Sequence, residues 1–253
     1  MPEPWLIATV VALGFVCGFI NVMAGGASFI SLPALIFLGL PPITANGTNR
    51  VALLVQNVVA VRKYHQHGMV DWQAGKVLTW PTLLGALIGA RIAVSFDEKL
   101  MTLVIAICMA AMFVILLWNP ARLQGQDQGD IEMRPSWKMQ LSFFAVGIYG
   151  GLIQAGSGIF MLFLIMASGY ELLRASALRL LLVLCFTPFA LAIFVIEGHV
   201  DWVIGLSLAL GNASGAFVGV RVAVDRGAGF ARLVLLVVLL GSTCLLFWRA
   251  LVG

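Results

Sequence analysis

Charged residues are scarce in this chain. Asp, Glu, Lys and Arg make up only 10% of its 253 residues, whereas 61% are hydrophobic. Soluble domains have about 25% charged residues, so this chain cannot cover its surface with groups that water solvates. A mean hydropathy of +1.04 agrees. We therefore expect an all-α polytopic membrane protein whose solvent is the lipid bilayer, and the net charge of +4 does not indicate a nucleic-acid partner.

Residues that hold metals or move protons are few as well. The four cysteines lie inside apolar runs, where buried small side chains are commoner than disulfides or metal ligands. The three histidines lie in expected loops, and no Asp or Glu occupies the middle of an apolar run. The sequence thus predicts no cofactor and no metal site, and it offers no carboxylate for a proton relay inside the membrane.

Ten apolar stretches follow one another along the chain. Crossing the hydrocarbon core takes about 20 helical residues, and most stretches approach that length. They occupy residues 5–24, 27–40, 45–61, 77–96, 100–118, 139–155, 158–169, 175–196, 202–224 and 230–248, of which the second and seventh are short. We expect eight to ten transmembrane or re-entrant helices in two repeats, 1–118 and 139–253, joined by a cytoplasmic polar linker at 119–138.

An eight-residue motif occurs twice, as GMVDWQAG at 68–75 and as GHVDWVIG at 198–205. The same offset of 130 aligns further identical residues without a gap, namely Gly26 with Gly156, Gly39 with Gly169, Ala45 with Ala175, Gly85 with Gly215, Gly89 with Gly219 and Arg91 with Arg221. So many matches at one offset indicate an internal duplication. Because each copy contains an odd number of segments, the copies should be inverted in the membrane, as in many secondary transporters.

The basic residues give an independent indication of orientation. With the N-terminus outside, ten of them fall on the cytoplasmic side and three on the outer side, which agrees with the preference of Lys and Arg for cytoplasmic loops. The inner ten are Arg62, Lys63, Lys76, Arg122, Arg134, Lys138, Arg174, Arg179, Arg226 and Arg232, and the outer three are Arg50, Lys99 and Arg249. Both termini are therefore expected outside.

Two glycine-containing breaks occur at corresponding positions, NVMAGGASF at 21–29 and LIQAGSGIF at 152–160. A short helix should begin directly after each. Non-helical backbone at membrane depth must be buried in protein or line a watery cavity, and helix N-termini suit an anion. Close helix packing is the alternative role of such glycines. Their paired placement favours a cavity, with candidate substrate-binding residues Asn21, Gly25, Gly26, Ser28, Gln154, Gly156 and Ser157.

A polar run, GLPPITANGTNR at 39–50, follows the first short helix. Its two prolines should end one helix, and Asn46 or Thr48 can cap the next, which we expect to start near Ala45. Capping accounts for one such side chain only. A cluster of donors without carboxylates is suited to an oxyanion, so the further candidates are Asn46, Thr48, Asn49 and Arg50, with Arg179 from the matching segment of the second repeat.

Arg91 and Arg221 lie in helices rich in small residues. A charge inside a membrane helix costs several kcal/mol, so an arginine there is a candidate functional residue. Snorkelling to the membrane surface is the alternative, since Arg91 is only about 9 Å along a helix from Asp97. Both are candidate anion contacts.

Two other classes of function fit the sequence less well. AGSG at 155–158 is faintly similar to the serine motif of intramembrane rhomboid proteases, but no apolar run contains a histidine that could serve as the base. An anion channel would need a continuous polar stripe, which the central stretches lack. We therefore expect a transporter and not an enzyme, with a channel, and behind it an intramembrane enzyme, as alternatives.

The segment GFINVMAGGASFISLPALIFLGLPPITANGTNRVA at 18–52, together with the repeated G-x-V-D-W loop and its downstream Gly-rich helix, resembles the sulfite exporter TauE/SafE family. The similarity extends over essentially the whole chain. Ala27 and Ser28 depart from it, because glycines are common there in the family. The resemblance implies a bacterial inner-membrane transporter of two related halves that moves anionic sulfur compounds or organic acids, often outward.

The hypothesis that results is alternating access with one arginine on each side. Arg50 would enter the membrane from outside and Arg179 from the cytoplasm, and each guanidinium can form two parallel hydrogen bonds to an oxyanion. Exchanging the conformations of the two repeats would expose one arginine at a time. The alternative is that both arginines anchor helix ends at the headgroups.

Overall fold

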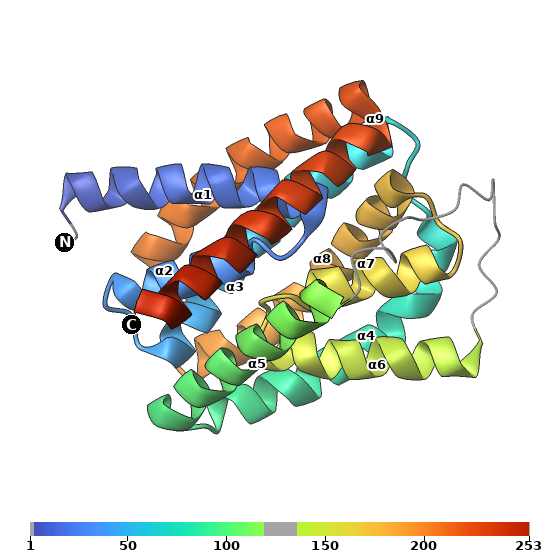
Figure 1. Ribbon diagram of the computed structural model, residues 1–253. Coiled ribbons are helices and arrows are strands. Elements are labelled where there is room, and N and C mark those ends of the chain that lie inside the picture. Colours follow the sequence, from blue (N-terminus) through green and yellow to red (C-terminus); the bar gives the residue numbers. More distant parts are fainter. Residues whose placement is uncertain (1–2, 119–135, 253) are drawn as a thin grey trace.

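The computed structural model describes residues 3–118 and 136–252 (Figure 1). Most of the expected linker, with Arg122 and Arg134, lies outside the described residues, as do the side chains of Arg232 and Arg249. Over the described ranges all regular secondary structure is helical, as the composition predicts. The helices are α1 (Pro4–Ala24), α2 (Ser28–Phe37), α3 (Pro42–Gln66), α4 (Trp72–Val94), α5 (Glu98–Trp118), α6 (Trp137–Leu152), α7 (Ser157–Ala167), α8 (Leu172–Ile196) and α9 (Trp202–Val252).

The helices differ in whether they can cross a membrane. By length and composition, α1, α4, α8 and the part of α9 before its break at Gly227 can do so. The short helices α2 and α7 have 10 and 11 residues. That is about 15–17 Å of helix, half of a hydrocarbon core of about 30 Å. The helices of the second and seventh stretches are therefore too short to cross the hydrocarbon core by themselves.

The start of α3 differs from the sequence-based expectation. Pro41 is the N-cap and Pro42 the first helical residue, a position where the missing N–H of proline is not needed. Asn46 and Thr48 consequently lie inside the helix, and the capping role expected for one of them is wrong. Arg50 is eight residues from the helix start, about 12 Å along the axis and deeper than expected.

The duplicated G-x-V-D-W motif has a local explanation. Gly68 and Gly198 follow the ends of α3 and α8 with φ of 67° and 76°, a conformation that favours glycine. Asp71 Oδ1 then accepts a hydrogen bond of 2.9 Å from the Ala74 N–H, and Asp201 Oδ1 accepts one of 2.9 Å from the Ile204 N–H. Each motif thus ends one helix with its glycine and begins the next with its aspartate.

Helix pairs pack in a pattern that matches the repeat. α1 packs along α9 and α4 along α6, and under the offset of 130 α1 corresponds to α6 and α4 to the first part of α9 (Figure 1). Glycines allow both pairs close approach: a Cβ added to Gly89 would lie 2.0 Å from Ile148 O, and one added to Gly211 would lie 2.1 Å from Val11 O. This is the pattern expected of two equivalent halves, while their inverted orientation stays a prediction.

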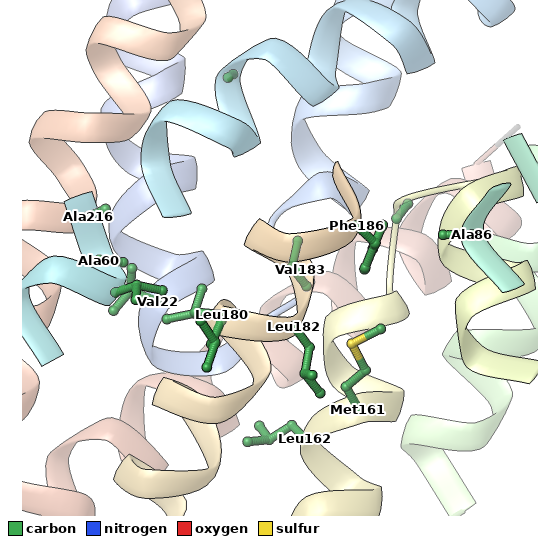
Figure 2. Packing of buried hydrophobic residues seen from close by; sticks show 14 of the residues in the cluster. Val22, Ala60, Ala86, Met161, Leu162, Leu180, Leu182, Val183, Phe186 and Ala216 are labelled. Carbon is green, nitrogen blue, oxygen red and sulfur yellow. The ribbon is translucent and has the colours of Figure 1, made fainter. Parts of the chain in front are cut away.

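The core surrounds α8, which packs against α3, α4 and α7. Leu162 of α7 and Leu182 of α8 are fully buried there, with Leu180 close by (Figure 2). The outer surface is apolar as well, since Ile196 is 81% and Leu210 69% exposed. Large exposed apolar side chains over several helices fit a surface covered by lipid rather than water.

Candidate functional site

Residues from both glycine breaks meet in one polar cavity. Its volume is about 20 Å³, room for about one water molecule, and it is partly open to the exterior. Seven of the predicted site residues line it: Asn21, Gly26, Ser28, Gln154, Gly156, Ser157 and Arg179. The sequence-based prediction placed these two breaks in one site although more than a hundred residues separate them.

The first turns of α2 and α7 form part of the cavity wall. Ser28 begins α2 and Ser157 begins α7, and neither helix has a side chain that caps its N-terminus. Gly26 and Gly156 precede them with φ of 80°, so the backbone turns sharply into each helix. Uncapped N-termini present N–H groups and a partial positive charge, which makes this wall suited to an anion.

Arg179 of α8 is 1% exposed and lines the cavity. Its Nη2 donates to Asn21 O at 2.8 Å and to Val22 O at 3.4 Å, in the last turn of α1. Gly25 and Gly158 make room for it, because a Cβ there would lie 2.5 Å and 2.9 Å from Nη1. Gly25 does not line the cavity, so its contribution is the space that it leaves for Arg179.

Arg50 of α3 is fully buried in a comparable environment outside that cavity wall. It donates to Gln154 Oε1 at 2.9 Å, to Gly150 O at 3.2 Å and to Gly151 O at 2.5 Å, at the end of α6. The ring of Phe194 lies 4.7 Å from its guanidinium carbon. Each arginine therefore binds the C-terminal carbonyls of the broken helix in the other repeat, where a cation is favourable.

The remaining donors predicted in α3 join helices and do not line the cavity. Asn46 Nδ2 donates to Leu152 O at 2.8 Å. Thr48 Oγ1 accepts from the Asp201 N–H at 2.9 Å, and Asn49 Oδ1 accepts from Ser31 Oγ at 2.8 Å. All three side chains are buried. They fix α3 against α6, α2 and the loop before α9.

Arg91 and Arg221 lie outside the cavity. Their side chains are 70% and 72% exposed. Arg91 forms an ion pair of 2.5 Å with Glu197, and Arg221 lies 3.8 Å from Asp225 one turn further along α9. The structure does not bring these two arginines together with the other candidates.

Some of the lining residues were not selected from the sequence. Leu53 and Asn57 of α3, and Leu180 and Val183 of α8, lie in the wall together with Gly158 of α7. Asn57 is the polar one, and it is fully buried. Its signal in the sequence is the pair Gln56–Asn57 inside an otherwise apolar part of α3, four residues after Leu53 and so on the same helix face.

The charge of the cavity wall is positive. Its described lining includes Arg179 but no Asp or Glu. Within the described ranges neither Arg50 nor Arg179 forms a salt bridge. A buried cation without a carboxylate partner is unfavourable, and a bound anion would compensate it.

Comparisons with known proteins agree with the resemblance noted in the sequence. The sequence profile described as "Sulfite exporter TauE/SafE" matches residues 10–246. A "Probable membrane transporter protein ORF9" of Sinorhizobium is 27% identical over 92% of this chain and 89% of that protein. The "Probable membrane transporter protein YfcA" of Escherichia coli K12 is 24% identical over 94% of this chain and 88% of that protein. No solved structure matches.

Proposed function

This chain belongs to the sulfite exporter TauE/SafE family, and from that premise we propose that it exports a small anion by alternating access between two inverted repeats. It is a multi-pass membrane transporter, as its family, the names of its relatives and its apolar helices indicate. The proposed substrate is sulfite, a sulfonate or a small organic acid. The proposed location is the bacterial inner membrane, with both termini outside.

One observation supports an anion above other solutes. Arg179 contributes a guanidinium to a cavity whose described lining contains no carboxylate and includes two uncapped helix N-termini. A cation would be repelled by this wall, and a neutral solute would leave the arginine uncompensated. The Nη2 of Arg179 already donates to Asn21 O of α1, whereas its Nε has no hydrogen-bond partner among the described residues.

The unequal surroundings of the two arginines support alternating access. Arg179 lines the cavity, whereas Arg50 is covered by Phe194. If the repeats exchange conformations, the Arg50 side opens while the Arg179 side closes. With the N-terminus outside, Arg179 is the nearer of the two to the cytoplasm, so the described state would load its anion from inside, as an exporter must.

The test of substrate class is a ligand panel on the purified protein. Sulfite, methanesulfonate and acetate should raise the unfolding temperature, because a ligand that binds only the folded state stabilises it. Sodium, potassium and glucose are the matched cationic and neutral controls. A response to the controls with none to the anions would refute the proposal.

The inverted arrangement has a test of its own. Gln66 is the last residue of α3, just before the first copy of the motif, and His199 lies within the second copy, after the end of α8. A single cysteine at each position, on a cysteine-free background, should react with a membrane-impermeant thiol reagent from opposite sides. Labelling of both from the same side would contradict inversion while leaving transport of an anion open.

A further inference from the structure

Three buried amide side chains, those of Asn57, Gln56 and Asn212, form a hydrogen-bonded relay that begins at the cavity wall. Asn212 Nδ2 of α9 donates to Gln56 Oε1 at 3.2 Å, and Gln56 Nε2 donates to Asn57 Oδ1 at 3.3 Å. All three side chains are between 0% and 1% exposed. Of the three, Asn57 lines the cavity. The relay thus links the cavity wall to α9 behind it.

Each end of this relay has a polar atom without a hydrogen-bond partner among the described residues. In the described part of the protein, Asn57 Nδ2 and Asn212 Oδ1 have no hydrogen-bond partner. Buried amide groups are rarely left unpaired, because an unmet donor loses its hydration without replacement. The free atom of Asn57 is a donor in a wall that also contains Arg179, so it is matched to an acceptor in the cavity.

We propose that Asn57 is a substrate-binding residue that donates a hydrogen bond to the transported anion. Gln56 and Asn212 are positioning residues that orient the Asn57 amide so that its nitrogen faces the cavity. This inference rests on the proposed anion transport. Asn212 donates to Gln56 and Gln56 donates to Asn57, so the Asn57 oxygen is occupied and its nitrogen is free. Without the donor on Asn212, Gln56 can turn over, and Asn57 then presents its oxygen, which repels an oxyanion.

The test uses sulfite and acetate as probes on the full-length protein, with Kd from ligand titration and transport from reconstituted vesicles. Asn57→Leu should raise Kd by about 10- to 100-fold, the range expected for one hydrogen bond to a charged group. Asn212→Leu, which does not touch the cavity, should raise Kd by about three- to tenfold and leave the maximal transport rate near wild type. Ser214→Ala is the matched control, since that hydroxyl donates only to α9 carbonyls, and its Kd should not change.

Asn212→Asp adds a readout that loss of packing does not produce. A protonated carboxyl can donate to Gln56 as asparagine does, whereas the carboxylate only accepts. The Kd of this variant should therefore lie near wild type at low pH and rise by about tenfold at high pH. If Asn212→Leu binds like wild type, a pH effect in Asn212→Asp is charge repulsion alone and the relay is wrong.

The outcomes separate the two proposals. A wild-type protein that responds to no anion overturns the proposed function and the relay together. A wild-type protein that binds sulfite or acetate, with Kd unchanged in both Asn57→Leu and Asn212→Leu, overturns the relay alone. Should Asn57→Leu fail to fold, as judged by size-exclusion chromatography, the Asn212 variants decide by themselves.

Discussion

Arg50 and Arg179 occupy comparable places in the two halves, but their surroundings differ. Each guanidinium is buried and binds backbone carbonyls at the end of a broken helix in the other half. Arg179 has the cavity beside it, whereas Arg50 has the ring of Phe194 and the side chain of Gln154. The shared contacts are thus structural, and the difference between the sites is access.

This difference distinguishes two roles that sequence alone treats as one. A guanidinium that bridges a helix end can hold the two halves together, and the same group can also bind an anion when a cavity opens next to it. In the described state the first role applies to both arginines and the second to Arg179. Variants that keep the charge but change its geometry should separate them.

The largest effect is expected from replacing each arginine by lysine. Lysine keeps the charge but loses the planar fork that donates to several acceptors at once. Arg50→Lys should lower transport by at least about 100-fold with sulfite Kd within about threefold of wild type, because three contacts to α6 and Gln154 are broken. Arg179→Lys should lower transport and also raise Kd by about tenfold.

Sulfite efflux from vesicles and ligand titration give the two quantities, and size-exclusion chromatography checks folding. Wild-type transport by Arg50→Lys would mean that Arg50 only anchors its helix. Equal increases in Kd for both variants would mean that both arginines contact the anion in one state, against alternating exposure.

Much of this comparison follows from the sequence, because the apolar runs and the repeat recur at regular intervals along it. Hydropathy gives the helices, the offset of 130 pairs the halves, and glycines between apolar runs mark the breaks that form the cavity. The roles of individual polar residues do not follow in the same way. Asn46 and Thr48 look like caps in sequence, yet Pro42 starts α3 earlier and places both inside it.

The role of Asn57 cannot be predicted from the sequence either. A single asparagine in a helix has no local signature that says whether its amide faces a neighbour, lipid or a cavity. That depends on α8 and α9, which pack against α3 from a distant part of the chain. Arg91 was likewise a candidate because of its depth along a helix, but its partner Glu197 is more than a hundred residues away.

A second pair of variants compares the packing of the two equivalent helix pairs, α4 with α6 and α9 with α1. Gly89 and Gly219 correspond under the offset of 130. A Cβ at Gly89 would lie 2.0 Å from Ile148 O, which forces α4 and α6 apart, whereas one at Gly219 would lie 3.1 Å from Phe19 O. Gly89→Ala should destabilise the protein by several kcal/mol and Gly219→Ala by no more than about 1 kcal/mol, since alanine gains helix propensity there.

The unfolding temperature of each purified variant measures this difference. Equal losses of stability would show that the two helix pairs pack alike at these positions. The asymmetry between the halves would then be confined to the cavity and its arginines.

The smallest effect is expected from the exposed arginines, which contrast with the buried pair. Arg91→Ala removes an ion pair with Glu197 in which the arginine side chain is 70% exposed. Such pairs contribute about 0–1 kcal/mol, so stability should change little, and sulfite Kd should stay within about twofold because Arg91 does not line the cavity. Glu197→Gln is the matched variant, since it breaks the same pair and keeps the arginine. A tenfold rise in Kd for Arg91→Ala without one for Glu197→Gln would place Arg91 on the path of the anion in another state, and the functional arginines would then number more than the buried two.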